Sequence, residues 1–371
     1  MAERLGGGEW SFEVEESWAK IPDEIVLGDC AAVGVDSKDN VYAFNRGDHP
    51  IAVFDQAGNL LRTWGEGVFT RPHGVHMAPD DTIWLTDDGD HTVRRCTLDG
   101  RVLLTIGIPG KPSPFMSGEP FHRCTHTALS PQCDHLYISD GYGNARIHKF
   151  TVDGKLLSSW GEPGTDPGQF NIPHNICCDP EGWLYVADRE NHRVQVFDGN
   201  GKWQTQWNYL HRPNGMCLAR GRVSGQSGPL CYIGEGGPSG EINRDWPNIG
   251  PRVSPYAERR EAGPTRQAAC RHPAGAVHLA TRHRGRFPRQ HLCRRIVGPL
   301  LVALLERSRA QEAPRHPPSQ ESRCVTLVLN GSGQCCRARR GGHSSPAAQG
   351  RSRRIPRRCR ARRAALSAHC G

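Results

Sequence analysis

The repeat DHLYISDGYGNARIHKFTVDGKLLSSWG, which runs from Asp134 to Gly161, decides the fold of this chain. Its β-branched and aromatic residues predict three short strands, separated by a polar loop and by a tight turn at Gly154. The same pattern occurs three more times, at Asp39–Gly65, Asp81–Gly107 and Gly182–Trp207. The turn glycines of successive repeats are 42, 54 and 47 residues apart, at Gly58, Gly100, Gly154 and Gly201. This period is typical of a β-propeller, in which each repeat supplies one blade of four strands.

Short connectors between the repeats predict the remaining strand, the innermost one of each following blade. They are RPHGVHMAP (Arg71–Pro79), HRCTHTALSP (His122–Pro131), IPHNICCDP (Ile172–Pro180) and RPNGMCLA (Arg212–Ala219). With a first inner strand over Val33–Asp36, the sequence predicts four blades and the start of a fifth near Leu230–Gly234. The predicted fold class is therefore all-β: an incomplete propeller of about four to five blades, followed by an irregular tail.

The repeats resemble NHL repeats, and three phrases carry a narrower resemblance. These are DGYGNARIHKF (Asp140–Phe150), SWGEPGTDPGQFNIPHN (Ser159–Asn175) and VADRENHRVQVF (Val186–Phe197). They resemble the lyase half of peptidylglycine α-amidating enzymes and their bacterial relatives, over roughly residues 30–253. That family is a six-bladed propeller. The resemblance implies zinc-dependent cleavage of a peptidyl-α-hydroxyglycine into a peptide amide and glyoxylate.

Two histidines hold equivalent positions two blades apart, His73 in PHG and His174 in PHN. Inner strands converge on the propeller axis, so both side chains are expected to point into the central channel. Three histidines from alternate blades would bind zinc and leave a position open for substrate. In the family that the chain resembles, the two matching histidines are zinc ligands and the third comes from a later blade; the carbonyl matching Val75 binds structural calcium. The alternative is that the histidines only fill a turn or the channel.

Three further residues match the catalytic positions of the same family. Tyr142, in SDGYGN, matches its catalytic tyrosine, and a phenol beside a metal ion can act as a general base. Arg46 and Arg189 match two arginines that line the site, where a guanidinium can pair with the carboxylate of glyoxylate. The alternatives are that Tyr142 packs on the propeller rim and that each arginine bonds to its own blade.

The N-terminal segment and the cysteines predict a cytoplasmic location. Met1–Trp18 contains five Glu and no apolar core, so it does not have the pattern of a secretory signal. The longest apolar run, Ile296–Leu305, is too short to cross a membrane, so no membrane partner is expected. Cysteines of the secreted animal enzymes are replaced here by Gly143, Tyr185 and Val196. We therefore expect reduced thiols, with His76, His122, His126, Cys177 and Cys178 filling strands rather than binding metal.

Charge divides the chain near residue 253. Residues 1–253 contain 22 Lys and Arg against 33 Asp and Glu, whereas residues 254–371 contain 25 Arg, five Glu and neither Lys nor Asp. The overall net charge of +9 thus joins a segment of −11 to one of +20. We predict an N-terminal lead-in at 1–29, the incomplete propeller at 30–253 and a largely disordered Arg-rich tail at 254–371.

Two interpretations of the tail compete. It could be a basic arm that binds nucleic acid non-specifically through phosphate contacts. Alternatively, it is translated from a shifted reading frame that begins near Val253–Tyr256. Codons for Pro273–His291, read one base over, can encode PGQFISPHGIAVDSRGDI, which repeats the pattern of Pro167–Leu184 and supplies a third histidine. We favour the shifted frame, and resequencing of the gene around codon 254 tests it.

The predicted function follows from these observations. If its site is intact, the chain resembles a peptidylamidoglycolate lyase, a carbon–nitrogen lyase that acts on a peptide or a small hydroxyglycine-like substrate in the channel. Loss of the last blade and of the third histidine is expected to impair it. The alternative is a non-catalytic NHL propeller that binds a peptide or protein on one face.

Overall fold

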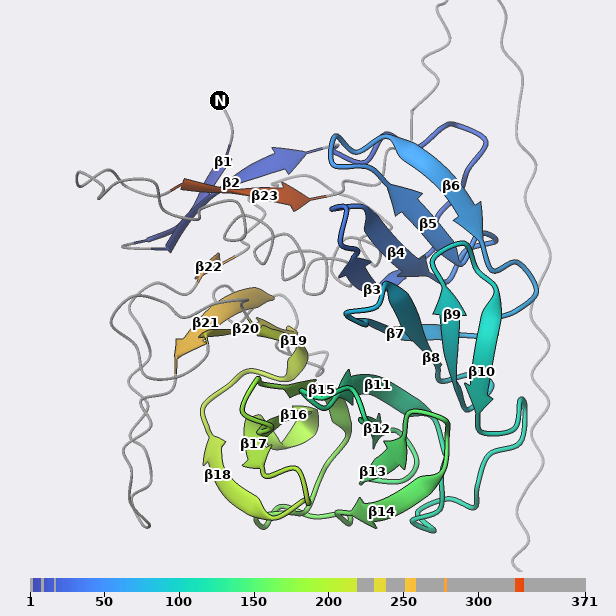
Figure 1. Cartoon of the computed structure of the whole chain (residues 1–371). Coiled ribbons are helices and arrows are strands. Elements are labelled where there is room, and N and C mark those ends of the chain that lie inside the picture. Colours follow the sequence, from blue (N-terminus) through green and yellow to red (C-terminus); the bar gives the residue numbers. More distant parts are fainter. Residues whose placement is uncertain are drawn as a thin grey trace, which may run out of the picture. The chain divides into compact units, whose positions relative to one another are not determined.

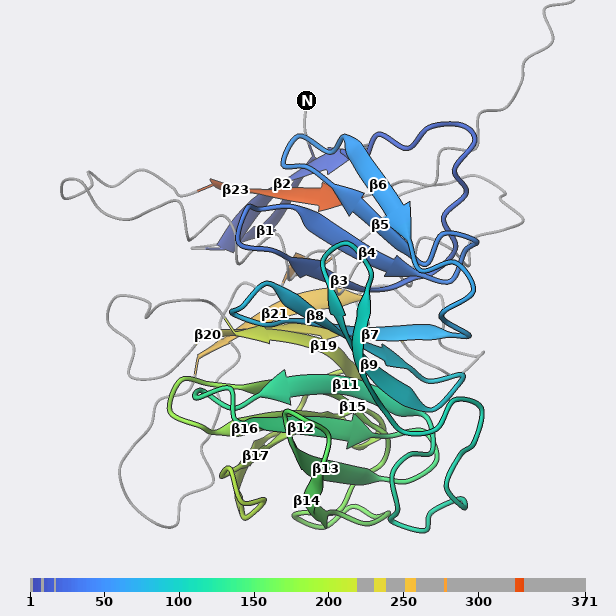
Figure 2. The ribbon, with the colours of Figure 1, turned by 45° about the vertical axis from the view of Figure 1, so that its right-hand side comes forward.

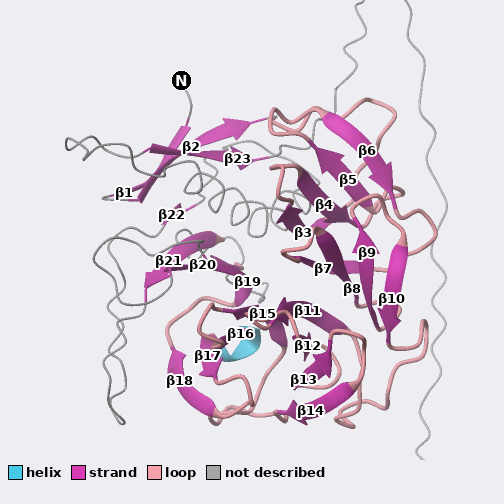
Figure 3. Cartoon of the chain, in the orientation of Figure 1, coloured by secondary structure: helices cyan, strands magenta, loops and turns pink. Residues whose placement is uncertain are grey.

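The computed structural model describes residues 18–218, 230–237 and 251–255 with their side chains. It also describes the backbone of strands at residues 3–7, 10–16, 256–257, 277–278 and 324–329. The chain divides into two compact units, Met1–Gly333 and Gln334–Gly371, and every described residue lies in the first. In this part the helical structure consists of one 3-10 turn, η1 (Arg189–Asn191), shown in cyan in Figure 3. None of the described helices is long and apolar enough to cross a membrane.

Five antiparallel four-stranded sheets form a β-propeller of five blades, as predicted (Figures 1 and 2). Blade one is β3 (Cys30–Val35), β4 (Val41–Asn45), β5 (Ile51–Phe54) and β6 (Leu60–Trp64). Blade two is β7 (Pro72–Met77), β8 (Thr82–Asp87), β9 (Thr92–Thr97) and β10 (Val102–Ile106). Blade three is β11 (Cys124–Leu129), β12 (His135–Asp140), β13 (Arg146–Thr151) and β14 (Leu156–Trp160). Blade four is β15 (Pro173–Cys178), β16 (Leu184–Asp188), β17 (Arg193–Phe197) and β18 (Trp203–Trp207). Blade five is β19 (Pro213–Leu218), β20 (Leu230–Glu235), β21 (Arg252–Ala257) and β22 (Val277–His278).

The connectors form the inner strands, as the sequence predicts. From β3 to β19, each inner strand lies beside the inner strand of the next blade. A separate sheet joins β1 (Glu3–Gly7), β2 (Trp10–Glu16) and β23 (Cys324–Leu329), with β2 and β23 parallel. The described part contains five blades, not the six of the resembling family. Most of residues 254–371 lie outside the described residues, so the disordered tail, its boundary at 253 and the shifted frame stay predictions.

The hydrophobic core lies between neighbouring blades. Buried Tyr42 and Phe44 of blade one, for example, belong to the same cluster as Ile83 and Leu85 of blade two. Burial of each such side chain contributes about 1.5–3 kcal/mol. The turn glycine of one blade packs against the last strand of the blade before it. At Gly100 φ is +99°, and an added Cβ would lie 2.9 Å from the Trp64 ring, so the turn requires glycine.

A buried polar residue ends the second strand of every blade and fixes the connector that precedes the inner strand. Its side chain accepts a backbone N–H from that connector in all five blades. These residues are Asn45, Asp87, Asp140, Asp188 and Glu235, each no more than 2% exposed. The polar loop in each repeat therefore sets where the start of each inner strand lies, which is where the candidate site forms.

Candidate functional site

Each inner strand has a β-bulge at its second residue. The bulged residues are Ala31, His73, Thr125, His174 and Asn214, in blades one to five. A bulge interrupts the pairing of a strand and turns its side chain in a new direction, as is common beside active sites. The two predicted zinc ligands are thus the bulged residues of blades two and four.

The two imidazoles are anchored in the same way. His73 Nδ1 lies 2.7 Å from the carbonyl oxygen of Thr125, and His174 Nδ1 lies 2.8 Å from that of Asn214. A backbone carbonyl can only accept a hydrogen bond, so Nδ1 carries the proton and Nε2 keeps its lone pair in both rings. Burial lowers the pKa of His73 to about 4 and that of His174 well below 6.5, so both are neutral near pH 7.

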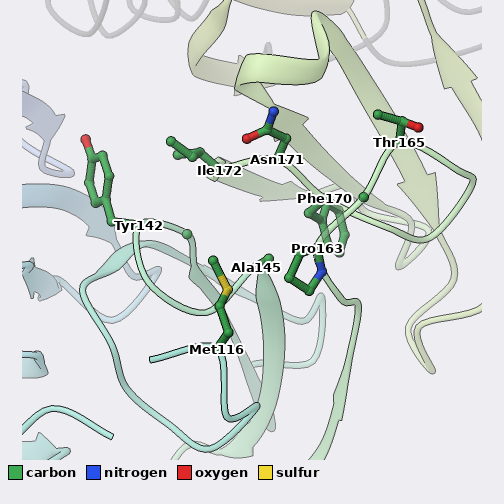
Figure 4. A pocket seen from close by; sticks show the side chains of 10 residues that line it. Met116, Tyr142, Ala145, Pro163, Thr165, Phe170, Asn171 and Ile172 are labelled. Atoms are coloured by element: carbon green, nitrogen blue, oxygen red, sulfur yellow. The ribbon is translucent and has the colours of Figure 1, made fainter. Parts of the chain in front are cut away.

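Tyr142 lies between these two histidines. Its hydroxyl oxygen is 3.0 Å from Nε2 of His73 and 3.0 Å from Nε2 of His174 (Tyr142 is labelled in Figure 4). A phenol has one proton to donate, and both ring nitrogens are acceptors. Among the described residues no other donor reaches either Nε2, so one buried lone pair is left without a partner. Such an acceptor pair is suited to a cation.

The two predicted arginines take different places. Arg189 Nη1 donates to the Tyr142 oxygen at 3.5 Å, and its guanidinium carbon lies 5.5 Å from the centre of the Tyr142 ring. Arg46 Nε instead donates to the carbonyl of Pro72 at 3.1 Å, beside the start of the His73 strand. Burial, with the charge of Arg71 next, lowers the pKa of Arg46. The structure therefore joins His73, His174, Tyr142 and Arg189 directly and places Arg46 at their edge.

Val75 lies buried in β7, two residues after His73. Burial lowers the pKa of the nearby His126 to about 4, and the backbone of Thr127 and then of Val75 act against this lowering. Calcium takes six to eight oxygen ligands, and an imidazole is not one of them. Calcium at Val75 stays a prediction, and we assign no step to it. Within the described residues, no group of three or more His, Cys, Asp and Glu side chains could hold a metal ion.

Two arginine clusters beside Tyr142 were not predicted from the sequence. The Asp88 cluster joins Arg71, Asp88 and Arg123 across blades two and three, and the Glu190 cluster joins Arg189, Glu190 and Arg212 across blades four and five. In both, one carboxylate accepts hydrogen bonds from two arginines. The available signal was an arginine directly before the inner strand in RPHG, HRCT and RPNG.

A cavity of about 160 Å³ opens beside Tyr142, between blades three and four. Its lining is mostly apolar and includes Met116, Pro163, Phe170 and Ile172 (Figure 4). In that view the Tyr142 hydroxyl points away from the other labelled side chains. The cavity and the histidines are therefore separated by the tyrosine itself.

The fold and its repeats define the chain as a β-propeller of the NHL type. The family description "NHL repeat" matches residues 170–197, which contain β15, β16 and β17. The chain is 36% identical to human NHL repeat-containing protein 3 over 222 residues, which are 56% of this chain and 63% of that protein. It is 31% identical to mouse peptidyl-glycine alpha-amidating monooxygenase over 237 residues, 53% of this chain and 24% of that protein.

A third relative is a lyase by name. Peptidyl-alpha-hydroxyglycine alpha-amidating lyase 1 of Drosophila melanogaster is 36% identical over 171 residues, 42% of this chain and 31% of that protein. The homologues of this NHL-repeat propeller thus include amidating lyases, as the sequence predicts. The chain spans less than two thirds of the length of each of these relatives.

Proposed function

We propose that this propeller carries the site of a zinc-dependent lyase that cleaves peptidyl-α-hydroxyglycines into a peptide amide and glyoxylate. The carrying observation is the convergence of two neutral imidazole nitrogens on one phenol oxygen. His73 and His174 each present Nε2 at 3.0 Å from the Tyr142 oxygen, with Nδ1 fixed by a carbonyl. Histidines that bind zinc commonly have the other ring nitrogen bonded in this way. The similarity to amidating lyases supports the same assignment.

The donor set fits zinc in part. Two neutral imidazoles are suitable ligands, whereas catalytic zinc sites usually have three protein ligands and an open position. The described residues supply two of the three. When bound, zinc would polarise an oxygen of the substrate. The third ligand falls where the sequence predicts a lost blade, so we expect weak zinc binding and low turnover from this chain.

The chain's own residues divide the remaining work. Tyr142, as the phenolate, takes the proton of the substrate hydroxyl while the carbon–oxygen double bond of glyoxylate forms. The carbon–nitrogen bond breaks at the same carbon, and the nitrogen takes the proton that Tyr142 removed, which forms the peptide amide and restores the phenolate. Arg189, which touches the Tyr142 oxygen, holds the phenolate and pairs with the carboxylate that leaves as glyoxylate. Arg46 lies at the edge of the site and adds positive charge there.

Zinc binding and glyoxylate release test the proposal separately. Equilibrium dialysis against zinc should show binding that is lost in His73→Ala and in His174→Ala. His135→Ala is the matched control, because His135 lies outside the site and pairs with Asp134. Tyr142→Phe should keep zinc but release no glyoxylate from a peptidyl-α-hydroxyglycine. If the purified chain binds no zinc and forms no glyoxylate, even at high protein concentration, the proposal is wrong.

A second candidate is a non-catalytic propeller that binds a peptide. The observation that favours it is the presence of only two imidazoles among the described residues at the candidate metal site. It predicts that His73→Ala leaves peptide binding unchanged, whereas the lyase proposal predicts that loss of zinc also weakens substrate binding.

A further inference from the structure

The Asp88 cluster holds two guanidinium groups beside the catalytic tyrosine. Asp88 Oδ2 accepts from Arg71 Nη1, and from Arg123 at Nε (3.1 Å) and Nη2 (2.6 Å). The guanidinium carbon of Arg123 lies 4.5 Å from the centre of the Tyr142 ring. One carboxylate oxygen therefore holds two arginines from neighbouring blades. Of these, Arg123 is close enough to contact a ligand bound at Tyr142.

The carboxylate is buried and the arginines are not. The Asp88 side chain is 0% exposed, while those of Arg71 and Arg123 are 37% and 39% exposed. Asp88 Oδ1 is buried and has no hydrogen-bond partner among the described residues. Burying a carboxylate in this way costs free energy, which argues against a purely stabilising role. Each arginine keeps donors for a ligand. Among the residues that the structure describes, no acceptor bonds to Arg71 Nε, Arg71 Nη2 or Arg123 Nη1.

The paired arginines and carboxylates around Tyr142 carry a net positive charge, although residues 1–253 are acidic. Five arginines, Arg46, Arg71, Arg123, Arg189 and Arg212, face three carboxylates, Asp29, Asp88 and Glu190. These eight residues leave two positive charges, in a segment whose net charge is −11. The proposed lyase reaction uses one negative charge, the carboxylate of the hydroxyglycine. A second positive charge remains for another anion.

We propose that Arg71 and Arg123 form a second carboxylate site, which recognises an acidic side chain on the residue that precedes the hydroxyglycine. The assignment of the first carboxylate to Arg189 rests on the proposed function. Neighbouring Cα atoms in a peptide are 3.8 Å apart, so a ligand held at Tyr142 places its preceding residue within reach of Arg123. Guanidinium groups fixed by Asp88 can bind a carboxylate with two parallel hydrogen bonds at little entropic cost.

The test compares two uncleavable probes that differ by one charge. N-acetyl-Glu-Gly has two carboxylates and N-acetyl-Gln-Gly has one, with nearly the same shape. Calorimetric titration of the full chain at low ionic strength should show about tenfold tighter binding of the Glu peptide, about 1.4 kcal/mol. Arg71→Gln and Arg123→Gln should each reduce this ratio to below twofold. Arg95→Gln is the matched control, since Arg95 pairs with Asp80 outside the site, and it should keep the tenfold ratio.

Equal affinity for the two probes in the unsubstituted chain, or no binding of either, overturns the inference. A tenfold ratio that persists in both variants also overturns it. Thermal melting of each variant checks that it is folded, and Arg71→Lys, which keeps the charge, should restore part of the ratio. The proposed lyase fails separately, when the Glu peptide binds selectively but no peptidyl-α-hydroxyglycine is cleaved.

Discussion

Blades two and three and blades four and five build the two halves of the candidate site, with histidines at equivalent positions. In the first pair His73 bonds to the carbonyl of the bulged residue Thr125, and in the second His174 bonds to that of Asn214. Each pair also joins two arginines through one carboxylate, which is Asp88 in the first pair and Glu190 in the second. The imidazoles depend on backbone carbonyls, so side-chain substitutions at Thr125 and Asn214 leave their anchors in place.

The two halves differ in how completely their polar side chains are paired. Thr125 Oγ1 lies 2.8 Å from both the carbonyl of Pro173 and Ser139 Oγ, whereas Asn214 Oδ1 is buried without a partner among the described residues. Asp88 is fully buried, and one of its carboxylate oxygens has no partner among the described residues. Glu190 is 22% exposed, and both of its oxygens accept hydrogen bonds from arginines. The first half thus has a fully buried carboxylate and the second a partly exposed one. This difference makes the first half the better place to fix arginines for a ligand.

Removing the anchor of blade four should have the largest effect. Asp188 accepts hydrogen bonds from the backbone of Asn171 and from the side chains of Arg193 and Gln195, and it is fully buried. Asp188→Ala leaves Arg193 without its carboxylate, and breaking a buried pair in this way costs about 3–5 kcal/mol. Urea unfolding measures this loss. Asp198→Ala, in an exposed turn of the same blade, should cost less than about 1 kcal/mol. Equal losses would contradict the role given to Asp188.

The blades were predictable because their chemistry is local. β-branched runs, turn glycines and a polar residue at the end of each second strand repeat at a regular period, and the structure confirms the all-β propeller that they predict. The approach of His73 and His174 followed from their equivalent positions on inner strands. The resemblance to lyases also predicted that Tyr142 belongs to the same site as the two histidines.

The arginine clusters could not be predicted in the same way. Asp88 bonds to Arg123, 35 positions along the chain, and that pairing depends on how two blades pack. The bulges were not predicted either, although Pro72 and Gly74 flank the bulged residue His73 and both residue types are common at bulges. The expected calcium site depended on Val75 alone, and a single carbonyl does not identify the other oxygen ligands that calcium needs.

Asp88→Asn tests the buried carboxylate of the first half. The substitution keeps the shape of the side chain but removes the charge that two arginines share. Because both arginines are partly exposed and can be hydrated, we expect a loss of about 2 kcal/mol, below the range for fully buried pairs. Urea unfolding gives the value, and Asp80→Asn, in the exposed pair with Arg95, should cost under about 1 kcal/mol. A neutral Asp88→Asn would show that Asp88 does not fix these arginines.

The bulged positions of blades three and five should respond differently to loss of their polar groups. Thr125→Val removes a hydroxyl that is fully bonded and should cost about 1–2 kcal/mol. Asn214→Ala removes a buried oxygen that has no partner among the described residues, so the free energy of unfolding should change by less than about 0.5 kcal/mol. Chemical denaturation of both variants gives the comparison. An equal or larger loss at Asn214 would contradict this difference in pairing between the two halves.

Glu190→Gln should have a smaller effect than Asp88→Asn, and its pH dependence distinguishes the charge of Glu190 from its shape. Partial burial acts to raise the pKa of Glu190, but hydrogen bonds from Arg212 and the charge of Arg189 outweigh it, so the pKa lies below 4.5. A carboxyl whose pKa is lowered by folding stabilises the protein above its unfolded pKa, and this contribution disappears as the pH falls through the folded pKa. Screening by solvent limits it to about 0.5–1 kcal/mol at pH 7. Thermal melting of Glu190→Gln should therefore show a lower Tm than the unsubstituted chain at pH 7, and the difference should shrink as the pH falls below 4.5. An offset that stays constant with pH would mean that Glu190 acts through packing rather than through its charge.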